Sequence, residues 1–319
     1  MEIASRGAGG PGAKEMTGEI AQTSGYYDYQ TLKKPVWTWE IPAYFFVGGT
    51  AGAAALLAAV ARRTGASDDL VRDARWIAAT GGGLSLPLLI SDLGRPERFL
   101  NMLRVFKLRS PMSVGAWTLV AFSNAAAASA FADLAHRATG GRMPVRVVAD
   151  AADVLSAATG LVMSTYTGVL LGATAIPVWS SNAAVLPVLF GASSLGSAVS
   201  MLELLGHDEP ALNAIGIGTA LAETAMAVRL ETSRAPEMRA ISQGPAGSLA
   251  RTASVLSGPL PLILRLLGRR SRSVRRIAAI STIAGSVLTR AAWVAAGKSG
   301  SGPDHAIATS SRAPADPVA

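Results

Sequence analysis

Three ionisable side chains stand at unusual places in a chain that is rich in long apolar runs. Glu40 lies near the start of the first run, Asp92 ends the second, and Tyr166 lies inside the fourth. Ionisable groups are costly in such surroundings, so those that are present usually serve a function. A carboxylate or a phenol there can accept, donate or relay a proton. We therefore take Asp92, Tyr166 and Glu40 as the candidate catalytic residues.

Each of the three also has a structural explanation. Glu40 could be a first-turn acid that the helix dipole favours, and Tyr166 could be a core tyrosine bonded to a backbone carbonyl. Asp92 could pair with Arg95, but a carboxylate at the C-terminal end of a helix opposes the dipole. It lies in the stretch SDLGRPERFLNMLRVFKLRSPMSVGAW, where five basic residues follow it. Asp92 is therefore the strongest functional candidate.

A second set of charged residues lies in the C-terminal half of the chain. Glu223 is the deepest of them, inside the apolar stretch GTALAETAMAVRLE. Buried carboxylates and arginines pair with one another or line wet cavities, so a structural ion pair and a proton path are the two interpretations. The candidate proton path consists of Glu203, Glu223, Arg229 and Arg290.

The elements that must position these residues are membrane spans. Half of the 319 residues are hydrophobic and 16 % are charged, whereas soluble domains carry about 25 % charged residues. Runs of roughly 20 apolar residues, the length that crosses a bilayer, predict eight helices. The predicted spans are residues 36–60, 76–93, 113–134, 147–179, 183–205, 211–230, 248–267 and 277–296. Proline bends a membrane helix, so the SGPLP at 257–261 predicts an interruption of the seventh.

The direction of the first four spans brings the candidate residues together. An even number of spans puts both ends of the chain on one face of the membrane. The opposite face then carries three basic loops, at residues 62–75, 137–146 and 265–276. The first span begins, the second ends, the third begins and the fourth ends on the face that carries both ends of the chain. We therefore expect convergence near that face of Glu40, Asp92, Ser110, Trp117 and Tyr166.

The composition excludes several kinds of redox centre from the chain. It contains no cysteine, so it forms neither a disulfide nor a thiolate-bound Fe–S cluster. Its three histidines lie at span ends and in the C-terminal tail, so no facing pair is available for haem b, and we expect no metal site. The net charge of +8 is concentrated between apolar runs, as in membrane loops, which disfavours nucleic acid as a partner. Electron transfer would then need a bound organic molecule such as a quinol, a carboxylate base and a partner protein.

Four stretches resemble the NrfD/polysulfide reductase family of membrane subunits. They are PVWTWEIPAYFFVGGTAGA, SDLGRPERFLNMLRVFKLRSPMSVGAW, YTGVLL and LTRAAWVAAGKSGSGPDHA. The resemblance covers roughly residues 25–312 and implies an all-α integral membrane protein of eight helices in two four-helix bundles. The corresponding division of the chain is a polar tail with an interfacial segment, the first bundle, the second bundle and a second polar tail, at residues 1–34, 35–181, 182–297 and 298–319.

The resemblance also implies a function. Family members anchor molybdopterin oxidoreductases, such as polysulfide reductase and formate dehydrogenase-like enzymes, and exchange electrons between quinone or menaquinone and a subunit with four Fe–S clusters. It implies that Asp92 and Tyr166 serve a quinone site in the first bundle. The first-span position is open among Glu40, Ile41 and Tyr44. The candidate quinone-binding residues are Tyr44, Arg95, Ser110 and Trp117.

We therefore expect a multi-pass subunit of the inner cell membrane that is not an enzyme on its own. Arg95 is expected to hold the Asp92 carboxylate, and the other basic residues near it are expected to face lipid headgroups or an acidic patch on the Fe–S partner. Two alternatives from other classes remain open. One is an ion- or proton-translocating subunit without a redox reaction, and the other is a purely structural anchor.

Overall fold

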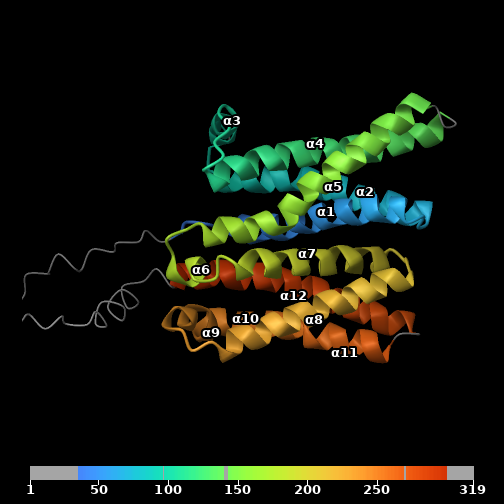
Figure 1. The fold of residues 1–319 in the computed structure, drawn as a ribbon. Coiled ribbons are helices and arrows are strands. Elements are labelled where there is room, and N and C mark those ends of the chain that lie inside the picture. Colours follow the sequence, from blue (N-terminus) through green and yellow to red (C-terminus); the bar gives the residue numbers. More distant parts are fainter. Residues whose placement is uncertain (1–34, 96, 140–142, 269–270, 300–319) are drawn as a thin grey trace, which may run out of the picture. The chain divides into compact units, whose positions relative to one another are not determined.

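The computed structural model describes residues 35–95, 97–139, 143–268 and 271–299, and every regular element within these ranges is a helix (Figure 1). The predicted all-α class is therefore confirmed. The expected N-terminal tail, and all but the first two residues of the expected C-terminal tail, lie outside the described residues.

Seven helices of 20 residues or more form the frame. They are α1 (Glu40–Arg63), α2 (Asp68–Asp92), α4 (Pro111–Ala138), α5 (Met143–Gly172), α7 (Val185–Leu204), α8 (Pro210–Thr232) and α12 (Arg272–Ser299). Shorter helices connect or complete them. They are α3 (Glu97–Leu103), α6 (Pro177–Ser180), η3 (Pro236–Met238), α9 (Arg239–Ser242), α10 (Gly244–Ser257) and α11 (Pro259–Leu267).

Six of the described helices are long and apolar enough to cross a membrane, namely α1, α4, α5 from residue 147 onwards, α7, α8 and α12. A seventh is counted if α2 and the bent α3 form one span. The expected number of eight is not confirmed, because α2 opens with a charged turn and because α10 and α11 are each too short alone. The break between α10 and α11 falls at Gly258, inside the SGPLP stretch that predicted an interruption.

The helices before residue 173 pack on one another, and so do those after residue 184. In the first group, α1 packs against α2 and α5, and α4 packs against the same two helices. In the second group, α12 contacts α7, α10 and α11, while α8 packs on α7 and α11. Contacts of α7 with α1 and α5 join the two groups.

Small residues let the first group approach closely. Gly52 of α1 and Gly160 of α5 face each other so tightly that a Cβ atom built on Gly160 would lie 2.6 Å from the Gly52 carbonyl oxygen. Helices in lipid associate through such small-residue contacts, because apolar side chains gain little by leaving lipid for protein. This contact fixes α5 against α1 and thereby sets where Tyr166 lies relative to the start of α1.

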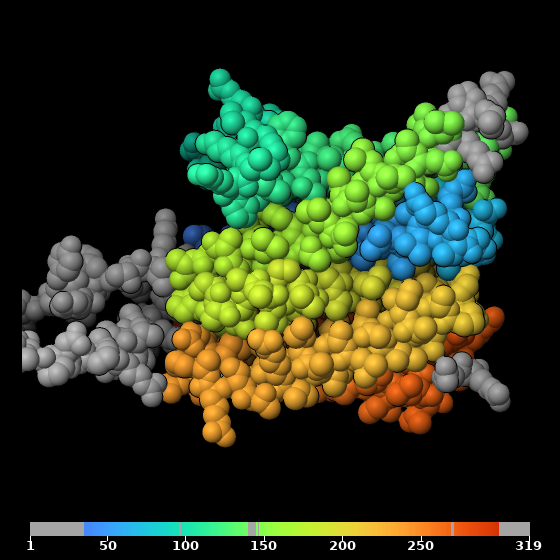
Figure 2. Space-filling model, in the orientation of Figure 1, coloured from blue at the N-terminus to red at the C-terminus, as the bar shows by residue number. Residues whose placement is uncertain are grey.

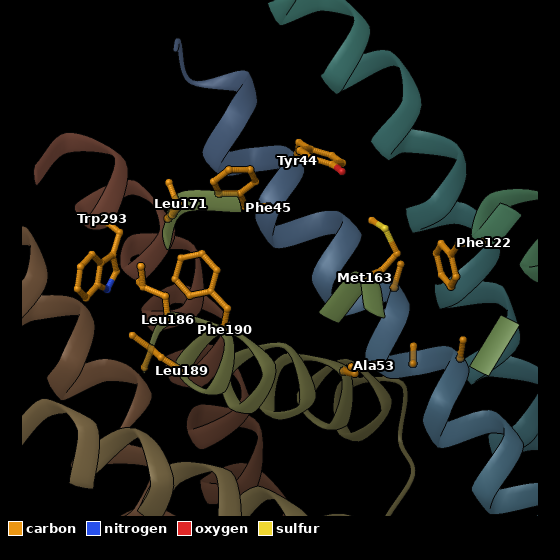
Figure 3. Close-up of a cluster of buried hydrophobic side chains, with 14 of the residues drawn as sticks. Tyr44, Phe45, Ala53, Phe122, Met163, Leu171, Leu186, Leu189, Phe190 and Trp293 are labelled. Atoms are coloured by element: carbon orange, nitrogen blue, oxygen red, sulfur yellow. The ribbon is translucent and has the colours of Figure 1, made fainter. Parts of the chain in front are cut away.

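The aromatic residues at the start of α1 divide between its two sides. Figure 3 shows Phe45 pointing toward Phe190 and Leu186 of α7, and Tyr44 pointing to the side where Met163 of α5 lies. Phe45 and Phe190 have ring centroids 6.4 Å apart. Phe45 therefore belongs to the junction with the second group, and Tyr44 to the interior of the first.

Two segments expected as loops are largely helical. In the predicted loop 62–75, α1 continues to Arg63 and α2 already begins at Asp68, where the Ser67 side chain accepts a hydrogen bond from the Leu70 N–H as an N-cap. In the predicted loop 265–276, α11 continues to Leu267 and α12 begins at Arg272. The apolar-run criterion ended these spans early because it stopped at the first charged residues.

Candidate functional site

The two predicted carboxylates at the ends of α1 and α2 meet on one threonine. The Thr38 hydroxyl is hydrogen-bonded to Glu40 Oε2 and lies 3.2 Å from Asp92 Oδ1. The Thr38 N–H also donates to Asp92 Oδ1, at 3.3 Å. A hydroxyl donates only one hydrogen at a time. Thr38 can therefore donate to one carboxylate at a time or share its hydrogen between the two, and it brings Glu40 and Asp92 to a common partner.

Local helix signals place these residues. Glu40 occupies the first turn of α1, where a carboxylate is stabilised by the helix dipole. Asp92 is the last residue of α2, where the dipole of α2 disfavours a carboxylate, so Asp92 depends on other partners. Thr38, just ahead of α1, supplies two of them. Because α1 begins and α2 ends at the same place, the expected convergence of Glu40 and Asp92 is seen directly in their shared partner.

Tyr166 is held at the start of α4. Its hydroxyl donates a hydrogen bond to the Pro111 carbonyl oxygen at 2.5 Å, and its ring lies on Gly115, where any Cβ atom would overlap the phenol. Tyr166 is 6 % exposed. The phenol of Tyr44 lies close enough to interact electrostatically with it. The pattern SPMSVG thus receives the fourth-helix tyrosine through a glycine and the second lone pair of a first-turn carbonyl oxygen.

A serine that sequence reasoning passed over anchors the basic segment to α4. The Ser113 hydroxyl accepts a hydrogen bond from the Lys107 N–H at 3.0 Å and donates to the Val105 carbonyl oxygen at 3.2 Å. Ser110, a predicted quinone-binding residue, is the N-cap of α4, and its hydroxyl accepts from the Ser113 N–H. Both serines hold the chain where it enters α4; the S-x-x-S spacing before an apolar run was the signal for them.

Arg95 and Trp117 do not join the carboxylates. Arg95 is exposed, and none of its described neighbours forms an ion pair with it. Trp117 is 39 % exposed and packs edge-on against Phe106, with ring centroids 6.0 Å apart. Arg95 lies just before α3, and Trp117 lies in the second turn of α4 against the segment that joins α3 to α4; α3 packs near the start of α4 (Figure 1).

The surface around α3 combines positive charge with apolar side chains. Arg95, Arg98, Arg104, Lys107 and Arg109 are all exposed. Between them lie the exposed apolar residues Leu100, Val105, Phe106 and Leu108. A mixed surface of this kind suits a lipid headgroup region or an acidic protein partner, which were the two expectations for it.

In the second group, Glu203 has a structural partner. Arg265 of α11 donates to both carboxylate oxygens of Glu203, each at 2.7 Å, and the guanidinium is completely buried. Gly216 of α8 makes room for it, because a Cβ atom there would overlap the guanidinium. Arg265 was expected in a loop and was missed as a partner. The only sequence signal for a buried Arg265 was its place inside the apolar stretch PLPLILRLL.

Arg290 is held by hydroxyl groups. Its guanidinium donates to Ser193 and Ser286 at 2.6 Å and to Ser194 at 2.9 Å, and it lies over the Phe190 ring with 5.1 Å between Cζ and the centroid. The side chain is fully buried. Serines spaced along α7 and α12 therefore form a cage around one positive charge.

Glu223 lies beside this cage and is 3 % exposed. Ser193, Ser257 and Arg290 are its polar neighbours, yet neither carboxylate oxygen has a hydrogen bond of ordinary geometry among the described residues. A cavity of about 20 Å³ adjoins it, lined also by Ser254 and Thr289, which is enough for one water molecule. Arg229, by contrast, is exposed in the last turn of α8 and lies outside this buried cluster.

A further buried ion cluster, which sequence reasoning did not identify, ties the first group together at the opposite end from Asp92. Arg75 of α2 pairs with Asp133 of α4 at 2.7 Å and with Asp153 of α5. Arg137 pairs with Asp133 at 2.9 Å, so the cluster is balanced in charge. Removing one member of a buried pair is strongly destabilising, and we assign this cluster to stability.

These features define an all-helical, multi-pass membrane protein with polar groups gathered at one end of its first helices. The chain belongs to the polysulfide reductase family of the NrfD type, whose sequence pattern matches residues 24–302. This confirms the family that the motifs resembled. No curated protein matches the chain at a comparable level.

Proposed function

We propose that the chain is the quinone-interacting membrane anchor of a multi-subunit oxidoreductase. It exchanges electrons between the quinone pool and a partner Fe–S subunit, which in turn serves a molybdopterin-type catalytic subunit. Membership of the polysulfide reductase family supports this function. The observation that carries it is the Thr38 bridge between Glu40 and Asp92, because it places two carboxyl groups and a hydroxyl in proton contact.

The residues suit a quinone by their chemistry. A quinol gives up two electrons and two protons when it is oxidised, so its site needs proton acceptors. Asp92 and Glu40 are the acceptors in this proposal, and Thr38 passes a proton between them. Tyr166 keeps its hydroxyl on the Pro111 carbonyl and so holds the start of α4 in place. Tyr44, which is buried on the side of α1 that faces Tyr166, adds a second phenol to the apolar interior.

The proposal includes a membrane arrangement. In it, α2 counts as a crossing, and α10 with α11 counts as one crossing broken at Gly258. Together with the six apolar helices this gives eight crossings in two four-helix bundles in the inner cell membrane. The exposed basic surface around α3 then faces the Fe–S partner, whose acidic residues would complement it.

The test is quinol oxidation by the purified complex. With Asp92→Asn we expect a loss of about 100-fold, because a lost general base typically costs that much or more, while the subunits remain assembled. The matched control is Asp150→Asn, which removes an exposed carboxylate paired with Arg62 at 3.2 Å and should leave the rate unchanged. Equal quinol oxidation by Asp92→Asn and the wild type would rule out this site.

A second candidate function, proton translocation through the second group, is supported by Glu223. A buried carboxylate with no hydrogen bond of ordinary geometry in the described part of the chain, beside a water-sized cavity and a broken helix, supports this function. In this function Glu203 and Arg290 flank the path, and redox chemistry is not required of the chain.

Proton uptake by vesicles separates the two. Glu223→Gln in the complex reconstituted into vesicles should abolish proton uptake coupled to turnover and leave quinol oxidation intact if the path exists. Unchanged proton uptake per quinol would eliminate it. Glu231→Gln, at the exposed end of α8, is the control.

A further inference from the structure

The cavity beside Glu223 extends from that carboxyl group toward one end of the molecule. On α8 it is lined by Glu223, Ala227 and Leu230, so along this helix it runs toward the C-terminal end. At the helical rise of about 1.5 Å per residue, the stretch from Glu223 to Leu230 is about 10 Å long. Ile241 of α9 and Trp293 near the end of α12 also line it. Glu223 therefore lies at the inner end of the cavity.

The end toward which the cavity runs is the end that carries Asp92. Trp179 of α6 stacks on Trp37, just ahead of α1, with 5.2 Å between ring centroids. Its indole N–H donates to the carbonyl oxygen of Trp293, a residue of the cavity lining, at 2.8 Å. Figure 1 shows α9 and α6 at the same end of the helices as α3, which follows Asp92.

The mouth of the cavity lies between α8 and α10. Leu230 of α8 and Ala250 of α10 are partly exposed, whereas Glu223 is 3 % exposed. Their sequence neighbours Glu231 and Arg251 are charged and exposed. Figure 2 shows the residues around the end of α8, in orange, at the molecular surface. Because charged side chains are costly in lipid, they keep this mouth in contact with water.

On the other side of Glu223 the helices are closely packed. Gly258, at the break between α10 and α11, approaches α8 so closely that a Cβ atom there would lie 2.9 Å from the Thr224 hydroxyl oxygen. Farther along, Arg265 is fully buried and donates to both carboxylate oxygens of Glu203. Glu203 lines a separate cavity at the start of α12, and that cavity does not include Glu223.

We propose that Glu223 exchanges protons with water at the membrane face that carries Asp92, and that it is closed to the opposite face. This inference rests on the second candidate function and names the face to which its carboxyl group opens. Water in the cavity carries the proton. A hydronium ion and the Glu223 carboxylate become water and a carboxylic acid, and the reverse step returns the proton to the same water.

Single cysteines test this access, because the chain has no cysteine of its own. The full chain is labelled in right-side-out and in inverted membrane vesicles with a charged, membrane-impermeant methanethiosulfonate, and mass spectrometry measures the rate. Ser233→Cys, after α8, and Ser273→Cys, at the start of α12, mark the two faces. We expect Ala250→Cys to react about ten-fold faster or more from the Ser233 face, because a charged reagent does not cross apolar protein.

Two neighbouring positions of α8 are the matched controls. Ala220→Cys lies one turn from Glu223 on the closed side, where Ala220 is 2 % exposed, and Leu221→Cys lies on the outer side of the helix, where Leu221 is 52 % exposed. Both should react from neither face. A water-soluble carbodiimide, which modifies protonated carboxyl groups, should modify Glu223 from the Ser233 face and the paired Glu203 from neither. Prior labelling of Ala250→Cys should prevent the modification of Glu223.

Faster reaction of Ala250→Cys from the Ser273 face, or reaction from neither face, would overturn the proposal. These results are separate from proton uptake. If Glu223→Gln abolishes uptake while Ala250→Cys stays unlabelled, the second candidate function stands and this access route is wrong. If Ala250→Cys and Glu223 are modified as expected while uptake by Glu223→Gln is unchanged, the access route stands and the translocation function is wrong.

Discussion

Arg265 of α11 and Glu203 of α7 form a two-point ion pair inside the second group of helices, with both N–O distances at 2.7 Å. The pair lies where Gly216 of α8 leaves space for the guanidinium, so three helices meet on one charge pair. Glu203 was predicted as part of a proton path, and the structure gives it a fixed structural partner. The pair links the broken α10–α11 segment to the rest of the second group.

We predict that Glu203→Gln destabilises the folded chain by about 3–5 kcal/mol, because it leaves a buried guanidinium without its counter-charge. Thermal unfolding in detergent measures this. Exposed Glu231→Gln should change stability little. Replacing both partners, Glu203→Leu with Arg265→Met, should recover most of the loss; a double variant as unstable as Glu203→Gln would contradict the pair's role.

Gly115→Ala should disturb Tyr166. The added methyl group would occupy the position of the phenol ring, and overpacking of this kind costs about 1–3 kcal/mol. We expect lower thermal stability and lower quinol oxidation by the complex. Gly83→Ala is the matched control, since a Cβ atom there has no neighbour within 4 Å. If Gly115→Ala is as stable and active as Gly83→Ala, Tyr166 does not lie where it is described.

Thr38→Val should uncouple Glu40 from Asp92. Valine keeps the shape of threonine but removes the hydroxyl that contacts both carboxyl groups. We predict that quinol oxidation by the complex falls about ten-fold, at the low end of general acid–base effects. Thr80→Val, which removes an exposed hydroxyl bonded only to its own helix, is the control. A rate equal to that of Thr80→Val would show that no proton passes through Thr38.

Trp179→Phe should loosen the junction of α6 with α12. The Trp179 indole N–H donates to the Trp293 carbonyl oxygen at 2.8 Å, and the ring stacks on Trp37 with 5.2 Å between centroids. Losing a buried hydrogen bond costs about 1–3 kcal/mol. The half-exposed Trp117→Phe should cost less, as measured by thermal unfolding in detergent. Equal losses from the two would show that the Trp293 contact does not contribute.

The sequence was sufficient to predict the helical class, the order of the long helices and the break at Gly258. These depend on apolar periodicity and on proline and glycine, which act locally. It also placed Glu40 and Asp92 at one end, because helix direction alone decides that. It could not reveal Thr38 as their link, since a short polar side chain ahead of a helix gives no distinctive pattern.

The arginines were the hardest residues to predict. Arg75 and Arg265 were taken as loop residues because charge ends an apolar run, yet both are buried in ion pairs within helices. Their partners lie in distant helices, so no local spacing announces them. For Tyr166, a bond to a backbone carbonyl was one of the two interpretations, but the Pro111 carbonyl itself carries no sequence signal that would single it out.

The serine cage of Arg290 has an electrical consequence for the membrane interior. Hydroxyl and carbonyl dipoles orient around the guanidinium but do not neutralise it, and none of the described carboxylates bonds to it directly. The neighbouring Glu223 carboxylate offsets part of the charge through space. Protein dipoles therefore take the place that water has around an exposed arginine, and they lower the cost of carrying a charge inside the apolar interior.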